Sequence, residues 1–351
     1  MTLTLPKCRM ALLALSLVVP AASAAADEPY QAVVAEIAKS FFAPAYRQAA
    51  EAAFANASAW KRYCQGRAAP DLDDLKARHK DLALAFAQIQ SFTLGPIGQG
   101  STRERLYFWP ERKNATAKGL AALLAGDAPI TAERVAKASA AAQGIPALEQ
   151  LIFGDDAAGG VQARPCEGGM AISANLAATL ADVAAAWNGP AGYAAQLAKG
   201  QVDPQLADSL QQVATDMVTG FAAGISSIQD QKLGPVIGKD AEEARPLQAE
   251  ARKSGLSKAM IVANIKGLRA FVASLDKGAD TLEIKSWDAM LGNIQSKVEA
   301  IDGFPEAMTD PARRAPAEKV LADLKVVHHL LETEIPVALD LKLGFNGLDG
   351  D

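Results

Sequence analysis

Apolar side chains recur along most of this chain with the spacing of an α-helix. The clearest case is residues 71–92, where apolar positions advance by three or four residues and so fall on one helical face. Asp71 follows Pro70, and its side chain can cap the first turn. The apolar stripe consists of Leu72, Leu75, His79, Leu82, Phe86 and Ile89. The pattern predicts one long amphipathic helix.

The same period runs through most of the remaining sequence. It predicts further helices over residues 30–65, 114–125, 131–143, 171–187, 205–227, 256–275, 281–300 and 316–340. No run of any length alternates between apolar and polar residues, as a half-buried strand would. Because long helices with such stripes bury them against one another, we expect an all-α protein built from helical bundles.

Two of the breaks between helical segments are alike. Leu94-Gly95-Pro96 and Leu233-Gly234-Pro235 each follow a long amphipathic segment, and about half of the chain separates them. This recurrence indicates an internal duplication, although chance repetition of a Gly-Pro turn is the alternative. A duplication predicts two helical-bundle domains, residues 27–168 and 169–351, with a ligand cleft between them.

The first 26 residues have the composition of an export signal. Lys7 and Arg9 precede an apolar run at residues 10–20, which is too short to cross a bilayer, and the small residues Ala22-Ser23-Ala24 follow it. Cys8 lies before the apolar run, where a lipid-accepting cysteine does not belong. We therefore expect a cleavable signal peptide over residues 1–26 and a periplasmic mature protein without a transmembrane segment.

The net charge argues against one class of partner, and the cysteine content predicts a disulfide. The formal net charge of the chain is −5, and removal of Lys7 and Arg9 with the signal lowers it to −7, which argues against nucleic acid as the main partner.

Cys64 and Cys166 remain after removal of the signal with Cys8, and an even pair in an oxidising compartment predicts a disulfide, with two separate thiols as the alternative. A bond across about 100 residues would contribute about 4 kcal/mol on the chain-entropy account.

Motifs of well-known enzyme classes are absent from the sequence. There is no HExxH zinc motif, no GxSxG nucleophile elbow, no P-loop and no dinucleotide-binding glycine pattern. Of the three histidines, His79 lies on an apolar stripe and is expected in the core, while His328 and His329 would point about 100° apart on a helix. We predict no catalytic residue, and the sequence favours a binding protein over an enzyme.

Residues 102–110 concentrate charged and aromatic side chains in a chain that is only 6% aromatic. Arg103 and Arg105 flank Glu104, and Trp109 lies near the end of the run. Arginine forks suit an anionic ligand or the carboxylate of a partner protein, and Trp109 would form a cleft wall. The alternative is that the aromatic rings plug the end of a bundle while the charges are solvated.

Residues 144–149 form a second candidate site. Gly144 ends the preceding helix, and Pro146 suits the first turn of the next one. Glu149 would then be fixed at a helix junction, where a carboxylate suits a hard cation such as iron(III). A capping or surface glutamate is the alternative.

These residues resemble those of the imelysin-like family, which includes the insulin-cleaving membrane protease and iron-regulated bacterial surface and periplasmic proteins. The resemblance spans essentially the whole mature chain. It is carried by residues 94–96, 105–110, 144–153, 254–257, Asn264 and residues 343–351. The family hallmark is GxHxxE, of which Gly144 and Glu149 match the ends. Pro146 replaces the histidine, so no histidine role can be transferred, and this departure argues against metal coordination as well as against a metallopeptidase.

The resemblance implies two helical bundles with a site between them, export, and an association with iron acquisition. The candidate ligand-binding residues are Arg103, Arg105, Trp109, Glu149, Ser254 and Asn264. Glu149 is also the candidate metal ligand, and iron is the cofactor that the resemblance points to. We therefore predict a periplasmic binding protein that engages iron, an iron-bearing ligand or an envelope protein. An imelysin-type peptidase and a helical envelope adaptor are the alternatives.

Overall fold

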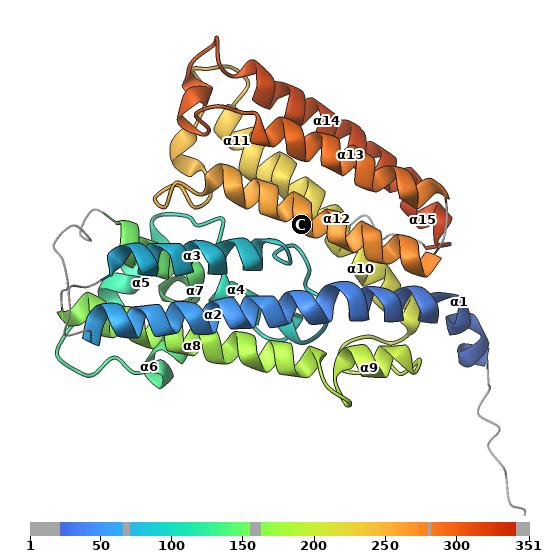
Figure 1. The fold of residues 1–351 in the computed structure, drawn as a ribbon, viewed down its shortest axis with the longest axis horizontal. Coiled ribbons are helices and arrows are strands. Elements are labelled where there is room, and N and C mark those ends of the chain that lie inside the picture. Colours follow the sequence, from blue (N-terminus) through green and yellow to red (C-terminus); the bar gives the residue numbers. More distant parts are fainter. Residues whose placement is uncertain (1–21, 66–70, 155–162, 280–281, 342–351) are drawn as a thin grey trace, which may run out of the picture.

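A computed structural model describes residues 22–65, 71–154, 163–279 and 282–341 of the chain. Within these ranges every regular element is helical and no strand occurs (Figure 1). The all-α prediction is therefore confirmed. Residues 1–21 of the predicted signal peptide, and the segment 343–351 that contributes to the family resemblance, lie outside the described residues.

The described chain begins with one long helical segment. The helix α1 (Ala22–Ile37) passes through a widened, π-helical turn at Ala38–Phe42 into α2 (Ala43–Gln65), and the residues at both joins keep right-handed helical angles. Alanine has the highest helix propensity, and its abundance here favours such a long continuous run. The segment extends along the length of the molecule (Figure 1).

A first layer of helices is organised around α2, which packs against α3 (Leu72–Ala87) and α8 (Ala163–Trp187). As predicted, Asp71 caps α3, because its carboxylate accepts a hydrogen bond from the Asp74 N–H at 2.8 Å. The shorter helices of this half are α4 (Thr102–Leu106), α5 (Ala115–Leu124), α6 (Ala132–Ala136), α7 (Gly144–Phe153) and α9 (Tyr193–Ala198).

The second layer lies above the first in the orientation of Figure 1. Its helices are α10 (Leu210–Ser226), α11 (Gly234–Ile237), α12 (Ser257–Ala279), α13 (Leu282–Glu299), α14 (Ala315–Thr333) and α15 (Ile335–Ala338). A second π-helical turn, Ser227–Leu233, joins α10 to α11. The helix α1 packs against α10 and α12, so the N-terminal segment contacts both layers.

Aromatic rings connect the two layers through a common core. Phe41, on the first π-helical turn, has its ring centroid 5.1 Å from that of Phe92 and 5.7 Å from that of Phe271 on α12. Phe271 in turn stacks on Phe221 of α10 at 5.3 Å. All four rings are buried, and each such pair contributes about 0.5–1.5 kcal/mol beyond burial of its area. The hydrophobic core is therefore continuous between the layers.

The helix predicted over residues 71–92 ends at Ala87, and that over residues 316–340 is divided after Thr333. Two further predicted helices differ from those observed at a serine. Residues 131–143 do not form one helix, because α6 ends at Ala136 and Ser139 caps a separate 3₁₀ turn, Ala140–Ala142. The helix predicted from residue 205 begins only at Leu210, since the Ser209 hydroxyl accepts the Gln212 N–H at 3.1 Å. Serine side chains compete with helical hydrogen bonds in this way.

The repeated Leu-Gly-Pro triplets adopt different conformations. Gly95 has a left-handed φ of 77°, whereas Gly234 has a φ of −52° and begins α11. The boundary expected between residues 168 and 169 falls inside α8. An internal duplication with two domains and a cleft therefore stays a prediction.

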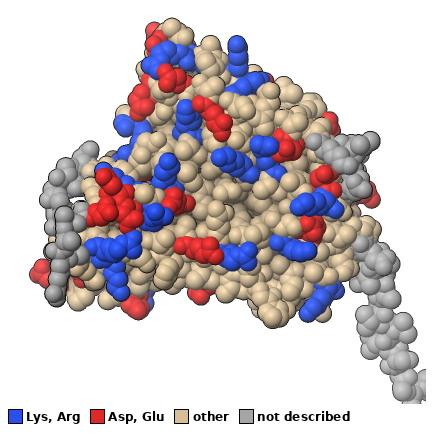
Figure 2. All heavy atoms as spheres, in the orientation of Figure 1, with Lys and Arg blue, Asp and Glu red and all other residues tan. Residues whose placement is uncertain are grey.

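The predicted disulfide between Cys64 and Cys166 is present and joins α2 to α8. Among the described residues, α8 is the one helix that is long and apolar enough to cross a membrane by length and composition. It packs along α2, and a buried core helix meets the same criterion. On the face drawn in Figure 2, basic and acidic side chains are interspersed over the surface.

Candidate functional site

A group of buried polar side chains lies where the end of α3, the π-helical turn after α10, and α12 meet. Lys232, on that turn, is only 3% exposed. Its Nζ lies 2.6 Å from Glu250 Oε2 and donates to Gln90 Oε1 at 2.9 Å and to Asn264 Oδ1 at 2.5 Å. The ammonium group thus has two hydrogen-bond acceptors and one ion-pair partner, and the Glu250 Oε2 atom forms no hydrogen bond with the residues that the structure describes.

The partners of Lys232 are also bonded to one another. Gln90 Nε2 donates to Glu250 Oε1 at 2.8 Å, and Asn264 Nδ2 donates to Gln90 Oε1 at 3.1 Å and to the Ala87 carbonyl at 2.7 Å. A buried ion pair is tolerated when hydrogen bonds satisfy its remaining groups. Burial lowers the pKa of Lys232, while the charge of Glu250 acts to raise it.

Close contact between α12 and α3 brings these residues together. A Cβ at Gly267 would lie only 2.0 Å from the carbonyl oxygen of Gln88, so any larger residue would push the helices apart. Asn264 is one helical turn earlier on the same face of α12 and therefore reaches the carbonyl of Ala87. The glycine thus positions Asn264 in the polar group.

A cavity of about 100 Å³ adjoins Lys232, and we call it the junction cavity. Its walls include Gln90, Arg103, Trp109, Lys232 and Asn264. Lys232 Nζ lies 5.4 Å from the centroid of the Trp109 ring, within the range of a cation–π contact. The cavity is smaller than the ~150 Å³ that holds a benzene molecule. It therefore suits a small functional group of a ligand and not the whole of a large one.

Arg103 supplies the second cation at the junction cavity. Its Nε donates to the backbone carbonyl of Gln90 at 3.2 Å, and it forms no ion pair with any residue that the structure describes. The other guanidinium nitrogens can bind an anion as a fork. Arg105 differs, because its side chain is exposed and bonds to Ser101 Oγ at 3.0 Å.

Glu149 is half-buried and bonds across the layers to Ser254. Its Oε1 accepts the Ser254 backbone N–H at 2.8 Å and the Ser254 hydroxyl at 2.7 Å. Burial raises the pKa of Glu149, the bonds from Ser254 oppose this shift, and the charge of Glu250 adds to it. The helix that carries Glu149 begins at Gly144, whose φ is 75° and whose Cβ, if present, would lie 2.3 Å from the Leu106 carbonyl oxygen.

The structure thus divides the predicted site residues into three sets. Arg103, Trp109 and Asn264 line the junction cavity, Glu149 and Ser254 bond to each other, and Arg105 faces solvent. Sequence reasoning assigned no role to Gln90, Tyr107, Lys232 or Glu250. Burial raises the pKa of Tyr107 well above its usual value, and the charges of Glu250 and Glu149 raise it further.

The carboxylates here do not form a ligand set for a bare iron ion. Gln90 and Lys232 contact the two oxygens of Glu250, and Glu149 Oε1 already accepts two hydrogen bonds. Within the described ranges, no group of three or more His, Cys, Asp or Glu side chains could hold a metal. Metal coordination by Glu149 stays a prediction.

Two of the histidines are accounted for by packing and hydrogen bonding. His79 is buried, as predicted, and its ring lies 5.7 Å from that of Phe153. Burial lowers the pKa of His79 to about 4. The His328 Nε2 lies 3.3 Å from Ser226 Oγ, on α10.

The chain is an all-helical protein in which a buried polar junction connects the two layers. The imelysin family model matches residues 42–331, and the chain belongs to this family. No curated protein matches the chain.

Two solved structures share the fold. An imelysin-like protein from Psychrobacter arcticum 273-4 has a TM-score of 0.72 and 19% identity, over 91% of this chain and 98% of that one. A putative iron-regulated protein A precursor from Parabacteroides distasonis ATCC 8503 has a TM-score of 0.64 and 17% identity, over 90% of this chain and 96% of that one. At these identities the likeness concerns the fold alone.

Proposed function

We propose that this chain is an exported binding protein of iron acquisition, which holds an anionic group of an iron-bearing ligand in the junction cavity. The supporting observation is the guanidinium of Arg103, which lines this cavity without an acidic partner among the described residues. Lys232 is already engaged by its ion pair with Glu250 and by two hydrogen bonds, so Arg103 is the group left to meet an incoming anion.

The chemistry of iron(III) agrees with this proposal. Its ligands are mainly oxygen anions, as expected for a hard cation, so a soluble chelate carries carboxylate or similar groups. The junction cavity is large enough for one such group, and Trp109 provides an apolar wall beside it. Because the cavity walls supply cations in place of metal ligands, the iron would arrive already chelated.

Two further facts support the cellular context. The disulfide between α2 and α8 is typical of proteins in an oxidising compartment, which favours the periplasm. One structural neighbour is described as a putative iron-regulated precursor. Neither alternative, the peptidase or the adaptor, has an observation of this kind in its favour among the described residues.

Calorimetric titration of the mature protein with ferric citrate, iron-free citrate and haem tests the proposal. We expect ferric citrate to bind, and the Arg103→Gln variant to bind at least 10-fold more weakly, because a charged hydrogen bond is worth about 1.5–3 kcal/mol. Arg105→Gln is the matched control and should bind within 2- to 3-fold of the wild type.

Absence of binding by all three compounds, or equal losses in the Arg103 and Arg105 variants, would count against the assignment. Binding of haem alone would point to an iron-bearing ligand of another shape. The Glu149→Gln variant tests whether the charge of Glu149 takes part in ligand binding in addition to its bonds with Ser254. This variant should retain the bonds from Ser254 and weaken binding only if the carboxylate charge contributes.

A further inference from the structure

The first Leu-Gly-Pro triplet contributes to a pocket that the proposed anion site does not use. This pocket has a volume of about 330 Å³, and we call it the α10 pocket, because Asp216 and Thr219 of α10 lie in its wall. It shares no wall residue with the junction cavity. Its other described wall residues are Thr93, Leu94, Gly95, Gly98, Gln99, Gln205 and Leu206. The two layers of the protein therefore meet at this pocket as well as at the junction.

Two glycines allow the chain to form the first-layer wall of the α10 pocket. Gly95 has a φ of 77°, and a Cβ there would lie 2.8 Å from the ring of Trp187 at the end of α8. A Cβ at Gly98 would lie 2.1 Å from the carbonyl oxygen of Thr93. The 3₁₀ turn Gly95–Gly98 is thus packed closely against α8 and against the residues before it. The turn therefore has a defined position beside the pocket.

Asp216 is the one charged residue among the described wall residues. It is half-buried, and its Oδ1 accepts a hydrogen bond from Gln212 Nε2 at 2.7 Å. No basic side chain in the described ranges forms an ion pair with it. Burial raises the pKa of Asp216, and the bond from Gln212 opposes this shift. The charged carboxylate is thus only partly compensated, and a cation in the pocket would compensate it.

The remaining polar wall residues supply neutral oxygen atoms. They are Thr93, Gln99, Gln205 and Thr219. A primary ammonium group has three N–H donors, so it can bind one carboxylate and neutral oxygens at the same time. A bare metal ion fits less well, because no group of three or more His, Cys, Asp or Glu side chains within the described ranges could hold one. The composition of the wall therefore favours an ammonium group.

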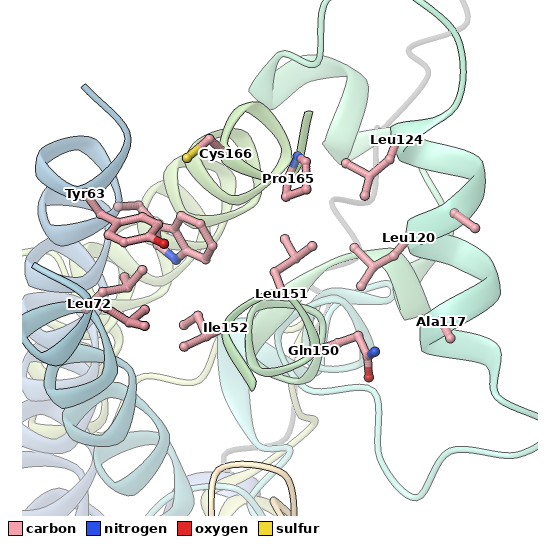
Figure 3. A pocket seen from close by; sticks show the side chains of 13 residues that line it. Tyr63, Leu72, Ala117, Leu120, Leu124, Gln150, Leu151, Ile152, Pro165 and Cys166 are labelled. Atoms are coloured by element: carbon pink, nitrogen blue, oxygen red, sulfur yellow. The ribbon is translucent and has the colours of Figure 1, made fainter. Parts of the chain in front are cut away.

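Another cavity, inside the first layer, has walls of a different kind. Figure 3 shows Leu120, Leu124, Leu151 and Ile152 around its open space. No charged side chain of the described residues lines it. A cationic group would lose its hydration there without gaining an opposite charge. Of these two spaces, only the α10 pocket offers a carboxylate to a cation.

We propose that the α10 pocket binds a primary ammonium group, which donates hydrogen bonds to the Asp216 carboxylate and to the neutral oxygens around it. The volume lies at the lower end of the range of about 300–1,000 Å³ that is typical of small-molecule sites. It admits a free alkylamine or the end of a lysine side chain of a peptide, which present the same group. This site is independent of the proposed anion site, so either assignment can fail without the other.

Backbone amide NMR of the full mature protein, titrated with butylammonium, tests this site. Sodium chloride at about 0.15 M screens the general attraction of amines to the acidic chain. We expect the amide signals of Gly95, Gly98 and Thr219 to shift. Asp216→Asn keeps an acceptor for Gln212 but removes the charge, so it should bind butylammonium about 3- to 10-fold more weakly. The matched control is Asp208→Asn, which is exposed and outside the wall and should bind within about 2-fold of the wild type.

Two further probes test the chemical group and its source. Tetramethylammonium carries the charge without an N–H donor and should bind at least about 5-fold more weakly than butylammonium. The amide Nα-acetyl-lysine-N-methylamide carries the same ammonium group on a peptide backbone. Tighter binding of this compound than of butylammonium would assign the group to a lysine of a protein partner, and weaker binding would assign it to a free amine.

The site would be overturned if neither primary amine bound the wild type, or if Asp216→Asn bound butylammonium as tightly as the wild type does. Equal binding of tetramethylammonium and butylammonium would overturn recognition through N–H donors.

Discussion

The ammonium group of Lys232 lies 2.6 Å from the carboxylate of Glu250, and both side chains are 2% exposed. Lys232 follows α10, and Glu250 lies in the segment before α12. Gln90, from the first layer, bonds to both. This ion pair therefore ties the second layer to the end of α3, and its loss should affect both stability and the junction cavity.

Replacing Lys232 by Met should lower the free energy of unfolding by about 3–5 kcal/mol, because the buried Glu250 would lose its only close cation among the described residues. Urea denaturation followed by circular dichroism measures this loss. The exposed Lys253→Met serves as the control and should cost less than about 1 kcal/mol. The double variant Lys232→Met/Glu250→Leu should be more stable than Lys232→Met alone. If the losses in free energy of unfolding caused by Lys232→Met and by Glu250→Leu simply add up in the double variant, the two side chains are not coupled as the geometry requires.

Gly267→Ala should destabilise the protein by at least 2 kcal/mol although alanine favours a helix. The added Cβ would meet the Gln88 carbonyl at 2.0 Å and force α12 away from α3. Gly292→Ala, on α13, is the matched control, since its Cβ would meet only the flexible Arg269 side chain at 3.3 Å. The midpoint of thermal unfolding should be clearly lower for Gly267→Ala than for Gly292→Ala, and the two midpoints should shift in opposite directions from the wild type if the alanine at 292 favours its helix. Similar midpoints would show that the close contact does not limit stability.

The stability of the protein should fall as the pH drops from about 6.5 to about 4, in part because of His79. Burial lowers the pKa of this imidazole to about 4, so the unfolded chain takes up a proton in this window that the folded chain does not. The shift corresponds to roughly 3 kcal/mol. Urea denaturation at several pH values should show a smaller loss in His79→Leu than in the wild type. Identical pH profiles for His79→Leu and the wild type would contradict this account.

Substituting serine for both Cys64 and Cys166 should lower the free energy of unfolding by about 4 kcal/mol. The bond closes a loop over a sequence separation of 102 residues, which restricts the unfolded chain. Guanidinium denaturation with and without dithiothreitol checks the prediction. The reductant should destabilise the wild type and leave the double variant unchanged. A response of the double variant to reductant would assign the effect to something other than this disulfide.

The sequence was sufficient to predict the helical architecture, because its signals are local. The stripe from Leu72 to Phe86 and the cap at Asp71 lie within one segment and are found as expected, whereas Ile89 lies in the turn after α3, which ends at Ala87. The disulfide followed from the count of cysteines and the expected compartment. The errors at residues 131–143 and 205–209 arose because serine caps override a helical period that continues through them.

The centre of the candidate site was not predictable in the same way. Lys232 stands in the polar run Gln229–Lys232, a pattern typical of a solvated loop, and Glu250 has no apolar stripe around it. In the folded chain Lys232 is buried and bonds to Gln90 and Asn264, which are distant in the sequence. Arg103 and Trp109 were recognisable because charged and aromatic residues are concentrated there. Which of the two arginines faces inward depends on the turn at α4, which the sequence pattern alone does not determine.

The uninterrupted helical segment from α1 to α2 limits how a ligand can be exchanged. It contacts α12 through α1 and α3 through α2, so spreading the two layers apart would require this segment to bend or break. Admission to the space beside Arg103 should therefore depend on rotation of individual side chains, with Trp109 the nearest apolar one, and not on opening of a hinge. The outline of the protein in solution should accordingly stay the same when its ligand is bound.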